Sequence, residues 1–291
     1  MYDTIVIGAG PAGITASVYL KRAGIDVLVF YQPNSELEKA HKIENYYGFE
    51  NGISGKELLD RGMKQAQNLN IPMIKKEVIG IKYSDDGFEV ITANQEYEEK
   101  YEAKFLILAT GASRSKPKIK GIEDYEGKGV SYCAICDGAF YRGKDVAVLG
   151  NGEYAVGEIE ELIPLAKKVT MLTDGKKAIE TRLESIEIKT NPIQEFRGDT
   201  KIREVLFKDG STQKIDGLFV AQGIASSIDF AKKLGAKIEN NYIVVNHKME
   251  TTIPNVYACG DCTGGILQVS KAIYEGTAAG LEIIKKMKGQ G

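Results

Sequence analysis

Four cysteines form two pairs of identical spacing, Cys133–Cys136 and Cys259–Cys262. Two thiols separated by two residues can close a disulfide or bind a metal ion. In a chain without a secretion signal, such pairs indicate redox or metal chemistry more than structural cross-links. A four-thiolate zinc site is one interpretation, but the pairs lie much farther apart in the sequence than those of a zinc ribbon. We therefore favour separate roles for the two pairs and expect no metal site.

The first pair has the surroundings of a reactive disulfide. A helix that starts at the pair would lower the pKa of a thiol through its dipole, and the thiolate is the reactive species. Asp137 follows Cys136 directly. Its carboxyl group either stabilises the start of a helix or acts as a general acid that protonates a leaving thiolate. The residues alone leave both interpretations open.

A glycine-rich turn near the N-terminus predicts a dinucleotide site. Gly8, Gly10 and Gly13 follow an apolar strand and precede a helical run. Glycines at this spacing allow a tight turn and let a pyrophosphate approach the start of the helix closely. The acidic residue that usually ends the second strand of such a unit is absent, and Tyr31 and Gln32 stand in its place. Either these polar side chains hold the ribose or that contact is lost.

A second turn of this kind, over 150–155, follows an apolar strand at 145–149 and opens another helix. Between the two turns, alternating segments at 88–93 and 97–103 predict a small antiparallel sheet, and 105–109 predicts a buried strand. The sequence therefore predicts an α/β fold with two Rossmann-like, three-layer (ββα) nucleotide-binding domains. The C-terminal tail is expected to return to the first domain and to make it discontinuous.

Composition limits the class of protein. The chain has 291 residues, which suits two domains. Its 43% hydrophobic and 27% charged residues support a buried core, and its net charge of −2 gives no reason to expect nucleic acid or a membrane as a partner. Glycines and a proline interrupt the longest apolar run, 4–20, so we expect no membrane span. With no signal peptide predicted, we expect a cytoplasmic protein.

At these motifs the chain resembles the low-molecular-weight thioredoxin reductase family of flavoproteins. The resemblance covers nearly the whole length and is carried by several segments: Gly8–Gly13, Ile43–Phe49, Gly55–Leu58, Ala109–Ala112, Gly129–Gly138, Ala258–Asp261 and Leu267–Val269. It implies an FAD-binding domain formed by residues 1–114 plus 247–291, and a central domain, 115–246, that carries the redox cysteines. It also implies a homodimer, and a central domain that rotates on two hinges, near 113–119 and 244–251.

The resemblance also implies which residues meet FAD. It places Gly8, Gly10 and Gly13 on the pyrophosphate, Val78 near the adenine, and Asp261 on the ribityl chain. Glu36, Leu37 and Asn45 are expected along the flavin arm, and Gln268 and Val269 at the isoalloxazine ring. The remaining expected cofactor residues are Pro11, Ala12, Tyr31, Gln32, Thr110, Gly111, Ala112 and Gly260.

By the same resemblance, Cys136 faces the flavin, and Cys133 attacks the disulfide of a thioredoxin to give a mixed disulfide that Cys136 resolves. Asp137 is then the expected general acid, a role that calls for a carboxyl group in an apolar pocket. Cys259 and Cys262 are expected to be buried beside the flavin loop without forming a second redox pair.

The second glycine turn departs from the family. Tyr154 replaces a small hydroxyl residue, and the arginines that hold the 2′-phosphate of NADPH are absent from 173–179. Losing two charge-assisted hydrogen bonds would weaken NADPH binding roughly a hundredfold or more. Asp174 would suit a free ribose hydroxyl, which favours NADH, while Lys176 and Lys177 are either partial replacements for the arginines or solvated turn residues.

This departure most resembles the ferredoxin-dependent flavin thioredoxin reductases, which keep FAD and the cysteine pair and lack a working nicotinamide site. Ferredoxin is therefore the expected electron donor, and thioredoxin the expected substrate. A reductase that uses NADPH or NADH through an altered clamp is the alternative. A redox sensor without catalysis is a further alternative, disfavoured by the intact cysteine pair and Asp137.

Overall fold

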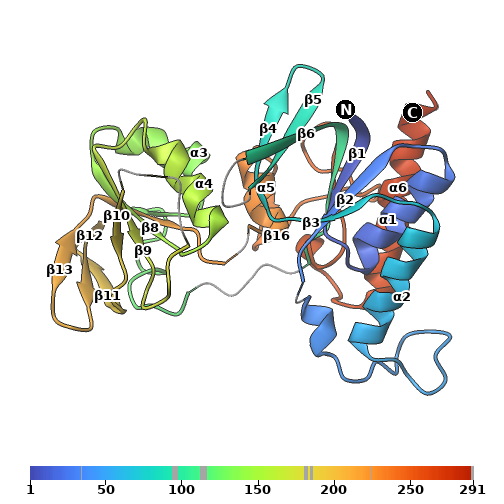
Figure 1. The fold of residues 1–291 in the computed structure, drawn as a ribbon, viewed down its shortest axis with the longest axis horizontal. Coiled ribbons are helices and arrows are strands. Elements are labelled where there is room, and N and C mark those ends of the chain that lie inside the picture. Colours follow the sequence, from blue (N-terminus) through green and yellow to red (C-terminus); the bar gives the residue numbers. More distant parts are fainter. Residues whose placement is uncertain are drawn as a thin grey trace. The chain divides into compact units, whose positions relative to one another are not determined.

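The computed structural model describes residues 1–33, 35–93, 98–111, 117–179, 183, 186–223 and 225–289. Internal contacts divide the chain into two compact units (Figure 1). The first comprises Met1–Thr92, Glu99–Arg114 and Ser226–Gly291, and the second Ala93–Glu98 and Ser115–Ala225. Each unit contains one of the two glycine turns, so the prediction of two Rossmann-like domains with a discontinuous first domain is confirmed.

A seven-stranded sheet forms the centre of the first unit. Five strands are parallel: β1 (Tyr2–Ile7), β2 (Val27–Tyr31), β3 (Met73–Lys75), β6 (Glu98–Leu108) and β17 (Val256–Ala258). The hairpin of β4 (Val78–Ser84) and β5 (Gly87–Ala93) extends the sheet beyond β6. The two expected segments at 97–103 and 105–109 are thus one long strand, β6, whose buried end pairs with both β1 and β17.

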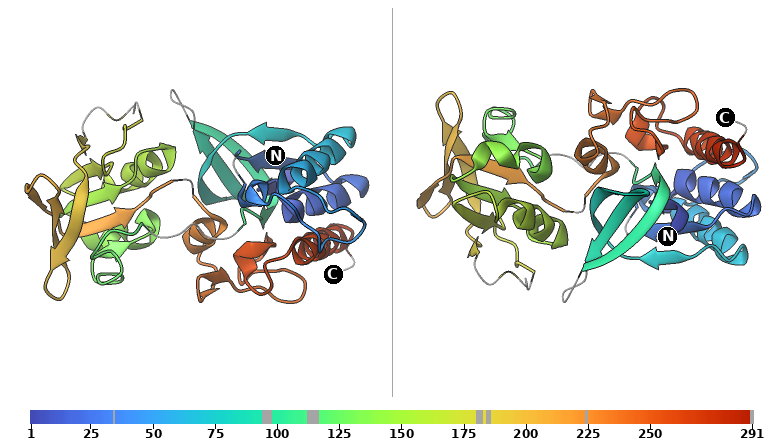
Figure 2. Two further views of the ribbon diagram at one scale, coloured as in Figure 1. Left: turned by 90° about the horizontal axis from the view of Figure 1, so that it is seen from below. Right: turned by 90° about the horizontal axis from the view of Figure 1, so that it is seen from above.

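Three helices lie side by side against this sheet: α1 (Pro11–Arg22), α2 (Gly55–Asn68) and α6 (Val269–Met287) (Figure 2). Small residues let α1 and α6 touch, because a Cβ atom on Gly276 would lie 2.2 Å from the carbonyl oxygen of Ala12. The shorter elements are η1 (Glu36–Lys39), α5 (Ser227–Lys233), β15 (Ile238–Glu239), β16 (Tyr242–Ile243) and η3 (Asp261–Thr263).

The second unit has three layers. Its parallel sheet has the order β10–β9–β8–β14–β7 and is formed by β7 (Val130–Ser131), β8 (Asp145–Leu149), β9 (Lys168–Leu172), β10 (Glu187–Lys189) and β14 (Gly217–Val220). Helix α4 (Glu153–Leu162) packs on this sheet and on α3 (Ala134–Asp137), which η2 (Gly138–Tyr141) follows. An antiparallel sheet of β11 (Ile193–Gly198), β12 (Ile202–Phe207) and β13 (Thr212–Lys214) shares a core with the parallel sheet.

The C-terminal return to the first unit differs from the expected position. The second unit ends at Ala225, not at 246, so the second crossing lies before the hinge expected near 244–251. Helix α5 explains the difference, because Ser227 hydrogen-bonds to Thr110 and the hydroxyl of Tyr83 donates to the carbonyl of Leu234 at 2.8 Å. Among the described residues, no helix combines the length and the apolar character needed to cross a membrane.

Candidate functional site

The expected cofactor residues of the first unit gather at one edge of its sheet. Strands β1, β2, β6 and β17 run parallel, so the residues that follow them lie at the same end. These residues are Gly8, Tyr31–Gln32, Thr110–Gly111 and Gly260–Asp261. In open α/β sheets, ligands bind outside the carboxyl ends of the strands, so this edge is the candidate cofactor site.

The first glycine turn has the shape that a pyrophosphate requires. Gly8 has φ +118°, and a Cβ atom on Gly13 would lie 1.9 Å from the carbonyl oxygen of Gly8, so both positions need glycine. Gly10 precedes α1 without any side-chain cap, and a Cβ atom at this position would have no neighbour within 4 Å beyond the adjacent residues of the chain. Pro11 occupies the first turn of the helix, where its missing N–H costs nothing. Open space in front of uncapped helix amides fits the phosphates of FAD.

The expected flavin arm is partly assembled by a long-range contact. The side-chain amide of Asn45 donates to Oε1 of Gln268 at 2.8 Å, which joins two expected residues that are 223 positions apart. Gln268 directly precedes α6, whose first residue is Val269 and whose start also lacks a side-chain cap. Leu37 packs closely against Gly55 at the start of α2.

Other expected residues lie at the margins of this edge. Glu36 is exposed and forms a 2.6 Å ion pair with Lys39, while Val78 is buried at the start of β4. The Thr110 amide donates to the hydroxyl of Ser227 at 2.9 Å, which fixes the turn after β6. Sequence reasoning missed Ser227, because its partner lies 117 positions away. Ala112 lies outside the described residues.

Asp261 sits in a turn with the geometry expected of a cofactor loop. Gly260 has φ +84°, a conformation that favours glycine. Asp261 is half-buried, and burial raises the pKa of its carboxyl group, partly offset by the positive charge of Lys271. The residues present at this edge therefore fit FAD: Gly10 would lie at the phosphates, and Asp261 and Gln268 would lie on the flavin side.

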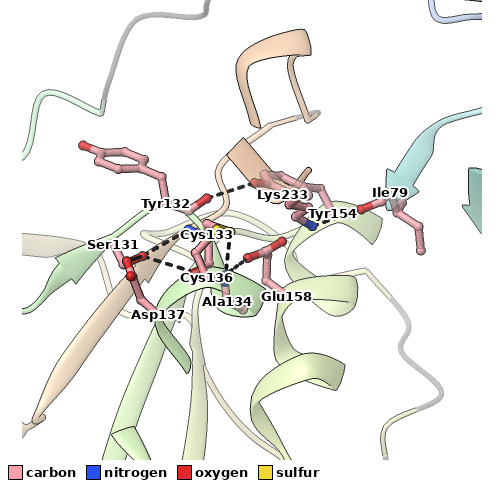
Figure 3. The surroundings of a disulfide bond; sticks show 10 residues. All are labelled: Ile79, Ser131, Tyr132, Cys133, Ala134, Cys136, Asp137, Tyr154, Glu158 and Lys233. Carbon is pink, nitrogen blue, oxygen red and sulfur yellow. Dashed lines mark hydrogen bonds between the residues drawn. A yellow bond between two sulfur atoms is a disulfide. The ribbon is translucent and has the colours of Figure 1, made fainter. Parts of the chain in front are cut away.

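In the second unit, Cys133 and Cys136 form a disulfide (Figure 3). Cys133 precedes α3, and its Sγ accepts the amide N–H of Cys136 at 3.2 Å. Cys133 is only 3% exposed, whereas Cys136 is exposed to solvent. The second pair, Cys259 and Cys262, belongs to the first unit.

Two carboxyl groups flank the disulfide. Asp137 is partly exposed and accepts the hydroxyl of Ser131 at 2.6 Å, so its surroundings are polar rather than the expected apolar pocket. The second group, Glu158 on α4, is 1% exposed, and its Oε2 accepts the amide N–H of Ala134 at 2.6 Å (Figure 3). Sequence reasoning missed Glu158. The sequence did hold a signal for its burial, since Glu158 lies on the same helix face as the apolar residues Ala155 and Ile159.

The second glycine turn is hydrogen-bonded to a later segment of the chain, residues 177–179. The Ile179 amide donates to the carbonyl of Asn151 at 3.0 Å, and the Asn151 side chain donates to the carbonyl of Lys177 at 3.2 Å. Tyr154 is buried, and its hydroxyl lies 3.5 Å from the Tyr132 carbonyl. The carboxylate of Asp174 accepts the amide N–H of Ile193 at 2.7 Å. Lys176 and Lys177 are exposed.

Cys259 and Cys262 are free thiols with no solvent exposure. Burial raises the pKa of Cys259 well above its ordinary value and that of Cys262 from 9.0 to about 12. The thiol of Cys262 also lies within hydrogen-bonding distance of the Leu108 carbonyl, at 3.4 Å. The structure agrees with the expectation that these cysteines are buried beside the Gly260–Asp261 turn without forming a disulfide.

We expect Ellman's reagent to detect no thiol in the folded, oxidised protein and both Cys259 and Cys262 after unfolding. Only thiolates react, and the raised pKa values keep these thiols protonated. Unfolding releases protons once the pH exceeds the unfolded thiol value of 9.0, so stability should fall as the pH rises from there. Rapid labelling of folded protein at neutral pH would contradict the buried assignment.

Comparisons with known proteins identify the family of this chain. The family model of pyridine nucleotide-disulphide oxidoreductases matches residues 2–276. A thioredoxin reductase of Aquifex aeolicus is 35% identical over 309 residues, covering 100% of this chain and 94% of the relative.

Two solved structures are also similar. The atypical thioredoxin reductase TRi of Desulfovibrio vulgaris Hildenborough has 39% identity and a TM-score of 0.91, and the match covers 100% of this chain and 99% of that one. A ferredoxin-flavin thioredoxin reductase of Clostridium acetobutylicum has 34% identity and a TM-score of 0.72, with 99% and 98% covered. The chain therefore belongs to the low-molecular-weight thioredoxin reductase family of the pyridine nucleotide-disulphide oxidoreductases.

Proposed function

We propose that this protein reduces the disulfide of thioredoxin with electrons from reduced ferredoxin, and that it works as a homodimer. As a flavin-dependent disulfide oxidoreductase of its family, it uses FAD, which when bound can accept single electrons and deliver a pair. A one-electron donor and a two-electron disulfide need such a cofactor between them. The choice of ferredoxin over a nicotinamide nucleotide rests on the second glycine turn.

Three features of that turn favour a donor other than NADPH. The backbone of 177–179 lies against Asn151, in the middle of the turn where a nucleotide would approach. Tyr154 brings a bulky, buried ring to the start of α4. Asp174, the candidate partner for a ribose hydroxyl, already accepts a hydrogen bond from Ile193. The likeness to a ferredoxin-flavin thioredoxin reductase points the same way.

The cysteine pair carries the disulfide chemistry. Reduction breaks the Cys133–Cys136 bond and takes up two electrons and two protons. Cys133 then attacks the disulfide of thioredoxin, and Cys136 resolves the mixed disulfide, which releases reduced thioredoxin and restores the internal disulfide. Asp137, which is held by Ser131, is proposed to donate the proton that the leaving thiolate requires. Cys133 is buried here, so the exchange requires a movement that exposes it.

Anaerobic titration of the oxidised holoprotein tests the donor. We expect photoreduced ferredoxin to bleach the visible flavin band and NADPH or NADH at micromolar concentrations to leave it unchanged. Added oxidised thioredoxin should then restore the band of the ferredoxin-reduced protein, because the disulfide accepts the electrons. Rapid bleaching by either nicotinamide would contradict the proposal and favour the altered-clamp alternative. Bleaching by ferredoxin without electron transfer to thioredoxin would contradict the proposal that thioredoxin is the substrate.

A further inference from the structure

The turn that carries Asp261 is held by two side chains from the start of α6. Lys271 and Glu275 lie one helical turn apart and form an ion pair at 3.1 Å. The Glu275 carboxylate accepts the amide N–H of Gly260 at 2.8 Å, and the Lys271 ammonium donates to the carbonyl of the same residue at 2.9 Å. Both polar groups of one residue of the main chain are therefore fixed by one ion pair, which we call the α6 clamp.

Thr263 completes the arrangement. Its hydroxyl lies 2.7 Å from the Gly260 carbonyl, 2.8 Å from the Lys271 ammonium and 2.9 Å from the Glu275 carboxylate. The α6 clamp thus spans η3 from the residue before it to its last residue. Asp261 lies between these two attachment points, so its backbone position follows from them.

The α6 clamp is mostly removed from solvent. The side chains of Lys271 and Glu275 are 18% and 9% exposed. Burying an ion pair contributes little net stability, because the loss of hydration offsets the attraction between the charges. A buried ion pair that binds the main chain of a glycine turn therefore indicates that the position of this turn matters more than the stability that the pair adds to the core. Burial raises the pKa of Asp261, and the two charges of the clamp act on it in opposite directions, since Lys271 lowers this pKa and Glu275 raises it.

We propose that Lys271 and Glu275 are positioning residues for the cofactor, which hold the Gly260–Thr263 turn in the conformation that binds FAD. The inference rests on the proposed role of Asp261 toward the ribityl chain. The clamp lies in the first unit and the redox cysteines lie in the second, so its effect is expected on cofactor affinity and not on the disulfide.

The test uses apoprotein titrated with FAD, with quenching of flavin fluorescence as the readout and circular dichroism as the check on folding. Lys271→Met removes two hydrogen bonds from a charged donor, and we expect it to weaken FAD binding about 10- to 100-fold. Lys271→Arg keeps the charge and should recover part of this loss. Glu275→Gln keeps an acceptor for Gly260 and should show a smaller loss than Lys271→Met.

The chain offers a matched control. Lys248 forms a 2.8 Å ion pair with Glu282, which also lies on the buried face of α6 but seven residues beyond Glu275. Lys248→Met should leave FAD affinity within about twofold of wild type.

Equal FAD affinity in wild type, Lys271→Met and Glu275→Gln would overturn the proposal. Equal losses of FAD affinity in Lys271→Met and Lys248→Met would overturn it as well. If Lys271→Met does not fold as apoprotein, Lys271→Arg and Glu275→Gln decide by the same comparison. A wild-type protein that binds no FAD would instead contradict the cofactor itself.

Discussion

Serine at either position of the redox pair, Cys133→Ser or Cys136→Ser, is expected to reduce thioredoxin-disulfide turnover at least about 1,000-fold, as removal of a nucleophile does elsewhere. Each variant loses the whole reaction, because a disulfide needs both sulfurs. FAD content should not change, since the pair lies in the second unit and the expected cofactor residues lie in the first. Turnover with reduced ferredoxin and oxidised thioredoxin gives the rate, and the visible spectrum gives the flavin content.

The two variants also separate the roles of the sulfurs. Cys136 is exposed and Cys133 is 3% exposed. A small alkylating agent should therefore modify Cys136 in the Cys133→Ser variant faster than Cys133 in the Cys136→Ser variant. The reverse order would mean that Cys133 is accessible in solution. Lys248→Met is a suitable control, because Lys248 lies in the first unit, pairs with Glu282 and should not be needed for turnover. Turnover retained by either serine variant would contradict the assigned disulfide.

Gly13→Ala is expected to yield protein without bound FAD. The new Cβ atom would lie 1.9 Å from the carbonyl oxygen of Gly8, and backbone at this distance can relieve the overlap only by moving. Overpacking of this kind costs about 1–3 kcal/mol or more, so we expect both lower stability and loss of the yellow colour. Thermal unfolding and the flavin spectrum of the purified protein measure the two effects.

Two further glycines make this prediction specific. Gly10→Ala meets no atom within 4 Å beyond the adjacent residues of the chain, and the extended backbone at φ −74° suits alanine. We expect it to lower FAD affinity by about tenfold or more while the apoprotein loses at most about 1 kcal/mol, the usual cost of such a helix cap. Gly62→Ala on α2 has only an ordinary contact, 3.8 Å from Ile14, and should keep both properties. Unchanged FAD affinity in Gly10→Ala would place the phosphates elsewhere.

The sequence predicted correctly those parts of the fold that depend only on residues close together in the chain. The strand, turn and helix around Gly8–Gly13 need only neighbouring residues, and the structure has them where expected. The compact second unit ends at Ala225 and not at the expected 246, because the chain after it contacts the first unit through Ser227 and Thr110, which no local pattern records. The same reason explains β6, since burial by β1 and β17 joins two segments that the sequence suggests are separate.

The candidate site divides in the same way. The glycine turn and the cysteine pair follow from residue types and spacing, whereas Asn45 and Gln268 entered only through the family resemblance. Glu158, Lys271 and Glu275 were missed because charged residues on helices are usually exposed. A signal was present, since Glu275 shares the i, i+4 and i+7 face of α6 with Ala279 and Glu282, and the structure buries all three.

The close packing of Gly276 on Ala12, together with β17 beside β6, has a consequence for synthesis on the ribosome. The second unit is complete in the nascent chain once Ala225 has emerged, but the first unit still lacks strand β17 and helix α6 until residues 256–287 are made. Domains fold as units during translation. The second unit is therefore expected to fold while the first is still unfinished. A truncated message should yield protein that cannot acquire its vitamin-derived cofactor.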